Sequence, residues 1–202
     1  MRTTTPLRRA LITVTATAAV ALTATGTAVA VPVSGTAAAP HATAGLHPVV
    51  ELASERLATA DLVAAAKWGT DSPIDDPARE QQVLDNVAAQ AQQLGADPDE
   101  IRVIFRDQIE ANKTVQRGLF QRWTDHPDQA PTTKPDLSVV RQEINRITSA
   151  LVQSLADTSE DRGTFACRPE LALAAFQVRY ENHLDGLHTR ALVRALPSVC
   201  RD

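Results

Sequence analysis

Two cations sit where apolar core residues would be expected. Arg56 lies on the inner stripe of a predicted first helix, and Lys67 follows eleven residues later. Eleven residues make almost three turns, so both side chains project from one face, about 16 Å apart along the axis. Two long cations at this spacing can grip one small anion between them. Each could instead lie along the edge of the stripe with its charge in water.

The next predicted helix starts with a group of residues on one face. Their spacing is i, i+3, i+4 and i+7, and they are Asp76, Arg79, Glu80 and Val83. Side chains at this spacing are neighbours on a helix surface. An exposed helix start with an ion pair accounts for the pattern as well as a binding site does.

A ladder of amides follows inside the apolar side of a long helix. Gln108, Asn112 and Gln116 are four residues apart, and buried amides need hydrogen-bond partners. They therefore either complete a structural network or face a polar ligand. Arg141 is a further cation beside an apolar stripe, between Val140 and Ile144.

Taken together, four helices offer one candidate site with four cations, two amides and two carboxylates. Its members are Arg56, Lys67, Arg79, Arg141, Asn112, Gln116, Asp76 and Glu80. Four converging cations suit a small dianion. No nucleophile–base pair is apparent, and His126, His183 and His188 are interpreted as solvation or packing residues. The histidines show no zinc-ligand spacing around the cysteines, so no metal site is predicted.

The elements that must position these residues are all helical. Apolar residues recur with a period of 3.6 and no segment alternates with period two. Helices are expected at about 49–68, 77–95, 98–123, 136–155 and 169–195, with a loop at 126–135 and a break at 159–164. The prediction is an all-α fold, a bundle of about five to six helices with one disulfide.

The N-terminal residues predict export. Arg2, Arg8 and Arg9 precede an apolar segment from about Ala10 to Ala30, which is typical of a signal peptide. We expect residues 1–30 to be this signal, with cleavage near Ala30 or Ala39, residues 31–46 to be a flexible tether, and 47–202 to be the domain. In an oxidising compartment the two cysteines, Cys167 and Cys200, are expected to pair.

The charge balance narrows the class of partner. After position 50 the chain has 17 basic and 24 acidic residues, a balance of −7. This argues against a nucleic-acid or anionic-membrane partner. No later segment is apolar enough to span a bilayer, so no membrane association is expected after signal cleavage.

Several short motifs resemble those of one enzyme family, the secreted all-α chorismate mutases of bacteria. The matching segments run in the same order with similar spacing, and they are Glu55-Arg56-Leu57, Ala65-Ala66-Lys67-Trp68, Pro73-Ile74-Asp75-Asp76-Pro77-Ala78-Arg79-Glu80, Phe105-Arg106-Asp107-Gln108-Ile109-Glu110-Ala111-Asn112-Lys113 and Pro135-Asp136-Leu137. The resemblance covers roughly residues 48–200, including the cysteine spacing.

The resemblance implies a role for each candidate residue. Arg56, Arg79 and Arg141 match the arginines that bind the two substrate carboxylates. Lys67 and Gln116 match the two donors to the ether oxygen of the breaking bond. Glu80 matches the acceptor of the ring hydroxyl, Asp76 an orienting acid, and Asn112 a small polar contact.

Two positions vary within this family. Some secreted members have Glu where this chain has Gln116, and some have Gln where this chain has Val83 and lack Glu at the position of Glu80. The combination of Glu80 with Gln116 is closer to the intracellular helical mutases. The implied reaction, chorismate to prephenate, is unimolecular and pericyclic, so it requires no nucleophile, metal or redox cofactor.

Two other classes of protein remain open on the residues alone. A secreted helical protein could bind a small dicarboxylate without chemistry, because arginine clamps serve binding and catalysis alike. A structural or host-interaction protein would neither bind nor convert such a ligand. The resemblance also implies a homodimer in which each site lies within one chain.

Overall fold

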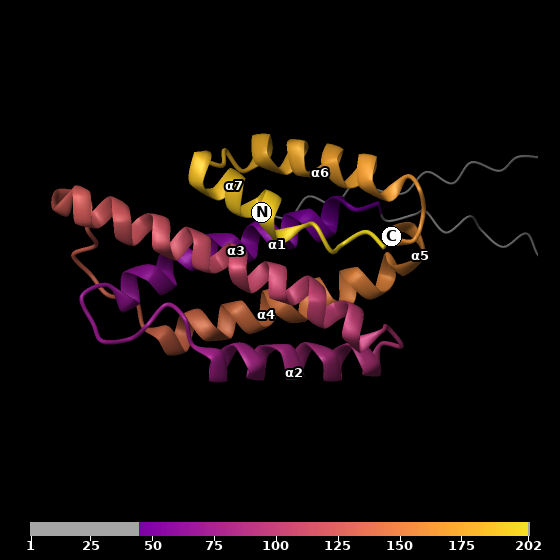
Figure 1. The fold of residues 1–202 in the computed structure, drawn as a ribbon, viewed down its shortest axis with the longest axis horizontal. Coiled ribbons are helices and arrows are strands. Elements are labelled where there is room, and N and C mark those ends of the chain that lie inside the picture. Colours follow the sequence, from indigo (N-terminus) through magenta and orange to yellow (C-terminus); the bar gives the residue numbers. More distant parts are fainter. Residues whose placement is uncertain (1–44, 202) are drawn as a thin grey trace, which may run out of the picture. The chain divides into compact units, whose positions relative to one another are not determined.

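The computed structural model describes residues 45–201, and all regular structure in that range is helical. The elements, in chain order, are α1 His47–Lys67, α2 Pro77–Gln93, α3 Pro98–Asp125, the 3-10 helix η1 Pro127–Gln129, α4 Leu137–Asp157, α5 Ser159–Arg162, α6 Cys167–Glu181 and α7 Gly186–Ala195 (Figure 1). The predicted all-α fold with one disulfide is confirmed. The predicted signal peptide and most of the predicted tether lie outside the described residues.

Aspartates start three of the long helices, α2, α3 and α4. Asp76 accepts a hydrogen bond from the backbone N–H of Arg79 at the start of α2, and Asp136 accepts one from Ser138 at the start of α4. An aspartate at this position satisfies backbone donors that have no partner within the helix. The end of α2 is also determined by a residue close by in the sequence. Gly95 adopts φ +73°, which glycine tolerates without strain.

The prediction of one last helix over 169–195 is wrong in one respect. The chain breaks after Glu181, and a separate helix, α7, starts at Gly186. His183 adopts φ +49°, and Asp185 accepts a hydrogen bond from the N–H of His188, so it caps α7. This cap was readable in the sequence, but the continuing apolar periodicity concealed it. The break between 159 and 164 also contains one helical turn, α5.

Helix α1 is the centre of the packing. It packs against α3, α4, α6 and α7. Helix α2 lies against α3 and α4, on the side of the bundle opposite α6 (Figure 1). Ala53, Ala60 and Ala64 are fully buried on α1. Small side chains let neighbouring helices approach closely, so α1 and its neighbours can bring their polar residues to one place.

Gly118 allows α7 to lie close to α3. A Cβ atom at this position would stand 2.6 Å from Cδ1 of Leu187. A side chain at this position would displace that of Leu187, so the glycine serves the packing of α7 and not the backbone conformation of α3.

The C-terminal tail is fastened at two places. Cys167 and Cys200 form a disulfide with a Cα–Cα distance of 5.8 Å. The fully buried guanidinium of Arg162 donates to the carbonyl oxygens of Leu155 and Val199 and forms an ion pair with Glu100. Because a buried charge requires such partners, Arg162 holds the tail against α3 and α4.

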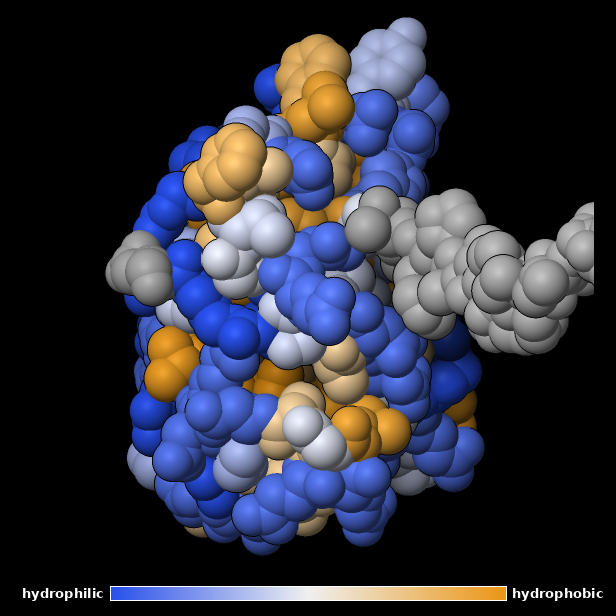
Figure 2. All heavy atoms as spheres, turned by 90° about the vertical axis from the view of Figure 1, so that its right-hand side faces the viewer, coloured by the Kyte–Doolittle hydropathy of each residue, from blue (hydrophilic) through white to orange (hydrophobic). Residues whose placement is uncertain are grey.

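Helix α6 is apolar on both faces. Its inner face buries Leu171 and Val178, whereas Leu173, Phe176 and Tyr180 are exposed on the outside. Figure 2 shows apolar side chains gathered at the upper end of the molecule, over this helix. Within residues 45–201, no helix is both long and apolar enough to cross a bilayer.

Candidate active site

One cavity of about 160 Å³ collects the predicted site residues. They come from α1, the start of α2, α3 and α4, and all eight line it: Arg56, Lys67, Asp76, Arg79, Glu80, Asn112, Gln116 and Arg141. The rest of its wall includes the apolar side chains of Val63, Ile74, Val83, Ile109, Leu137 and Ile144. The cavity therefore combines an apolar wall with a dense set of charged groups, as a small polar ligand requires.

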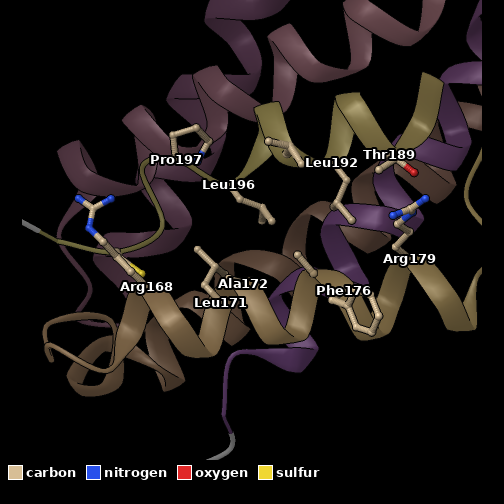
Figure 3. A pocket seen from close by; sticks show the side chains of 12 residues that line it. Arg168, Leu171, Ala172, Phe176, Arg179, Thr189, Leu192, Leu196 and Pro197 are labelled. Atoms are coloured by element: carbon tan, nitrogen blue, oxygen red, sulfur yellow. The ribbon is translucent and has the colours of Figure 1, made fainter. Parts of the chain in front are cut away.

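A larger cavity of about 410 Å³ lies between α6 and α7 (Figure 3). Its wall is mainly aliphatic and aromatic, with Arg168 and Arg179 among the polar members, and it contains none of the eight predicted residues. Size does not identify the site, because this cavity and a neighbouring one of about 440 Å³ at Phe176, Tyr180 and His183 are both larger than the first. The chemistry selects the smaller one, because a concentration of charged and amide groups is what a small dianion needs.

Arg56 is the most buried cation of the site. Its side chain donates to the backbone oxygen of Gln108 over 3.3 Å and lies over the ring of Phe105, while Nε has no partner within residues 45–201. Burial lowers the pKa of Arg56 to about 10, so the guanidinium stays charged at neutral pH. An anion in the cavity would complete its incomplete set of hydrogen bonds.

Lys67 lies at the C-terminal end of α1. Its Nζ donates to the backbone oxygen of Pro73 over 2.7 Å, which ties the loop before α2 to α1. Burial lowers the pKa of Lys67, Asp76 opposes this change, and the positive charge of Arg141 adds to it. Two cations from α1 and α4 thus influence each other across the cavity, which favours the binding of an anion.

The start of α2 is held by reciprocal hydrogen bonds. Asp76 accepts from the N–H of Arg79 at 3.0 Å, and Oε1 of Glu80 accepts from the N–H of Asp76 at 3.3 Å. The guanidinium of Arg79 donates to Gln82 at 3.2 Å. In place of the ion pair considered as one alternative, Asp76 forms a backbone cap with Arg79, and both side chains also line the cavity.

The three amides of α3 do not share one function. Gln108 donates to the backbone oxygen of Ala195 over 2.9 Å and lies outside the cavity, so it is a structural residue that joins α3 to α7. Asn112 donates to the backbone oxygen of Arg56 over 3.3 Å, and Gln116 donates to Oδ1 of Asn112 over 2.8 Å. Oε1 of Gln116 is buried without a partner within residues 45–201.

Arg141 is the exposed member of the set. It lies one turn after the start of α4, and it forms no hydrogen bond or ion pair with any residue between 45 and 201. Its charge is consequently available to a ligand at the mouth of the cavity. Leu137 and Ile144, also on α4, flank it in the cavity wall.

Lys113 was missed by sequence reasoning. It lines the cavity, is 7% exposed, and forms ion pairs with Asp75, Glu80 and Glu110. Its spacing to Glu110 is that of a helical ion pair and was visible in the sequence. Its contact with Glu80, 33 positions away, depends on how α2 lies against α3, which no local pattern contains.

The histidines between residues 45 and 201 are not part of this cavity wall. His188 bridges α1 and the start of α7 through Asp61 and Asp185. These hydrogen bonds raise the pKa of His188 to about 9 against the effect of burial. No group of three or more His, Cys, Asp or Glu residues in the described part of the chain could hold a metal ion.

The fold and the cavity define a class: an all-helical protein that presents cations, amides and carboxylates to a small anion. The family described as "Chorismate mutase type II" matches residues 48–117. A protein named secreted chorismate mutase from Mycolicibacterium smegmatis is 39% identical over 80% of this chain and 92% of its own length. One of the same name from Mycobacterium tuberculosis is 32% identical over 84% of this chain and 85% of its own length.

Comparison with solved structures points to the same family. A chorismate mutase from Burkholderia phymatum superposes with a TM-score of 0.74 and 35% identity, covering 78% of this chain and 96% of the other. The chain belongs to the chorismate mutase family, as its motifs predicted.

Proposed function

We propose that this chain is an isomerase that rearranges chorismate to prephenate in the cavity between α1, α2, α3 and α4. The observation that carries the proposal is the convergence of Arg56, Lys67, Arg79 and Arg141 with one hydroxyl acceptor in one small cavity. The reaction is unimolecular. The protein must therefore hold the side chain of the substrate folded over the ring and stabilise the negative charge that grows on the ether oxygen.

The three arginines bind the two substrate carboxylates. Guanidinium groups match carboxylates with two parallel hydrogen bonds, which fixes orientation as well as supplying charge. Arg56 is buried with an unused Nε, and Arg141 is unpaired within residues 45–201, so both have donors to offer. The carboxylates fasten the two ends of the substrate, and this favours the folded conformation from which the reaction proceeds.

Lys67 and Gln116 donate to the ether oxygen of the breaking bond. An ammonium has three N–H donors and Pro73 uses one of them, so donors of Lys67 remain for the substrate. The amide nitrogen of Gln116 has two N–H groups and Asn112 takes one. Donors held in place before the reaction stabilise the developing charge without a reorganisation cost.

Glu80 accepts a hydrogen bond from the ring hydroxyl, and Asp76 orients the start of α2. Oε1 of Glu80 already has partners, whereas Oε2 has none within residues 45–201. The unused oxygen is suited to the hydroxyl. The cap by Asp76 fixes Arg79 and Glu80 relative to each other.

A direct assay tests this function against non-catalytic binding of a dicarboxylate. Purified domain 47–202 is mixed with chorismate, and the loss of chorismate absorbance in the near ultraviolet is followed. Prephenate formation proportional to enzyme concentration supports catalysis. Saturable binding of chorismate without turnover would instead establish a binding protein and contradict the proposal.

Two further proposals concern the whole chain. We propose export through residues 1–30, supported by the relatives named as secreted and by the basic-then-apolar start. Intact mass of the exported protein tests it, with N-termini after Ala30 or Ala39 expected.

We also propose a homodimer, supported by the exposed apolar side chains of α6, and light scattering coupled to gel filtration tests it.

A further inference from the structure

Lys113 lines the cavity but directs its charge to carboxylates of the protein. It lies on α3 beside Asn112 and one turn before Gln116. Its Nζ is 3.0 Å from Oε1 of Glu80 and 3.2 Å from Oδ1 of Asp75, and it also pairs with Glu110. One ammonium therefore joins α3, the start of α2 and the loop before it.

The ammonium of Lys113 has no donor left for a ligand. It carries three N–H groups, and three carboxylates from Asp75, Glu80 and Glu110 surround it. Lys67 differs, because its ammonium donates to a single carbonyl oxygen within residues 45–201. Lys113 is thus unsuited to contact a substrate, although it lies in the wall of the site.

Glu80 is fixed asymmetrically by this arrangement. Its Oε1 accepts from both Lys113 and the N–H of Asp76, and its Oε2 is unpartnered within residues 45–201. Asp75 is in turn held by Arg117 at 2.6 and 2.9 Å. The carboxylate of Glu80 consequently has one oxygen fastened and one free.

Lys113 is protonated and positively charged at neutral pH. Burial alone would lower its pKa, but the hydrogen bonds to Glu110, Glu80 and Asp75 outweigh burial and raise the pKa above its ordinary value. The hydrogen bonds of Asp75 to Arg117 and Lys113 lower the pKa of Asp75. Without Lys113, the nearby carboxylates would depend on more distant or more exposed cations: Lys67 near Asp76 and Glu80, Arg117 on Asp75, and Arg194 on Glu110.

We propose that Lys113 is a positioning residue for Glu80: it holds one carboxylate oxygen in place, so that the other oxygen accepts the ring hydroxyl of the substrate. The inference rests on the proposed function for its effect on turnover. It does not rest on that function for the contact between Lys113 and Glu80, which can be measured without substrate.

The first experiment compares Lys113→Met, Lys113→Arg and Lys134→Met. Lys113→Met is expected to lower kcat/KM by about 10- to 100-fold, the scale for misplacing a positioned group. Lys113→Arg keeps the charge and should recover most of the loss. Lys134 is exposed in a loop and is not part of the cavity wall, so Lys134→Met should match wild type.

A double variant separates positioning from direct contact. Because Lys113 acts through Glu80, Lys113→Met should cost little further activity in a Glu80→Gln background. Independent losses that multiply in the double variant would mean that Lys113 contacts the substrate itself and would overturn the proposal. If Lys113→Met fails to fold, Lys113→Gln, which keeps a hydrogen-bond donor without the charge, replaces it.

The second experiment does not depend on turnover. The carbon-13 carboxyl resonance of Glu80, assigned with Glu80→Gln, is compared at one neutral pH in wild type and Lys113→Met. The resonance is expected to move in the variant, because one carboxylate oxygen loses its hydrogen bond to the ammonium of Lys113. An unchanged resonance would refute the positioning role. An inactive wild type with a moved resonance in the variant would remove the proposed function and leave the Lys113–Glu80 contact standing.

Discussion

The side-chain nitrogen of Gln116 donates to Oδ1 of Asn112 over 2.8 Å, and Asn112 donates in turn to the backbone oxygen of Arg56. Because Asn112 uses its nitrogen for a carbonyl group, only its oxygen can accept from Gln116. The amide of Gln116 therefore cannot turn over without losing this bond. This chain of two hydrogen bonds fixes a donor at the site where the ether oxygen is proposed to lie.

Gln116→Glu is expected to convert a flat pH–activity profile into an acid-preferring one. An amide donates at any ordinary pH, so wild type should be flat between about pH 5 and 8, whereas a carboxyl group, with a reference pKa of about 4.3, donates only while protonated. The variant should lose kcat/KM as pH rises through the new carboxyl's pKa. Gln142→Glu makes the same change on the exposed face of α4 and should stay flat. Parallel profiles for wild type and Gln116→Glu would show that Gln116 does not face the breaking bond.

Removal of an arginine from the clamp is expected to weaken binding and turnover together. Arg79→Ala and Arg141→Ala should each lower kcat/KM by roughly 10²-fold or more, because a carboxylate is then desolvated without its partner. Arg106 is an exposed arginine of α3 outside the cavity, and Arg106→Ala serves as the matched control. Wild-type kinetics in both clamp variants would remove these residues from the site.

Reduction of the disulfide is expected to lower stability and spare the chemistry. Cys167 and Cys200 are 33 positions apart, and closing a loop of that size stabilises the folded state by roughly 3–4 kcal/mol in the chain-entropy estimate. The bond fastens the tail to α6 and takes no part in the cavity wall. Reduced protein should melt at lower temperature and keep its kcat at low temperature. An unchanged Tm after complete reduction would contradict this expectation.

His188 is expected to make stability depend on pH on the alkaline side. Its hydrogen bonds to Asp61 and Asp185 raise its pKa from 6.5 to about 9 in the folded protein. A raised pKa contributes stability that is fully present below the unfolded value and is lost as pH rises through the folded value. The free energy of unfolding should therefore decline between about pH 6.5 and 9. Denaturant melts across this range, with His188→Asn as the comparison, test it; the variant should lack most of the decline.

Much of the fold was readable from local sequence. Each signal used for the helices lies within a few neighbouring residues: the apolar period of 3.6, the aspartate caps and Gly95. The first four long helices were therefore predicted with nearly correct ends. The disulfide followed from an even cysteine count and the expected compartment. The division of the last predicted helix failed because apolar periodicity continues across the break at His183.

The membership of the site followed from residue type and position, but its internal connections did not. Sequence placed all eight residues in one group, because polar side chains on apolar stripes must find polar partners when the stripes are buried. In the sequence, Gln108, Asn112 and Gln116 are equivalent steps of one ladder. The tertiary structure supplies the reason why only the last two belong to the site: Gln108 meets a carbonyl of α7, while the other two face the cavity.

Lys113 has one contact that could be predicted from the sequence and two that depend on the tertiary structure. Its spacing to Glu110 is a property of one helix, and the sequence contained it. Its contacts with Glu80 and Asp75 join segments more than 30 positions apart, and they exist only because α2 and its preceding loop lie against α3 at one register. A hydrogen bond requires its two heavy atoms to lie within about 3 Å of each other. Contacts between such distant segments therefore depend on how whole helices pack, and no local pattern predicts them.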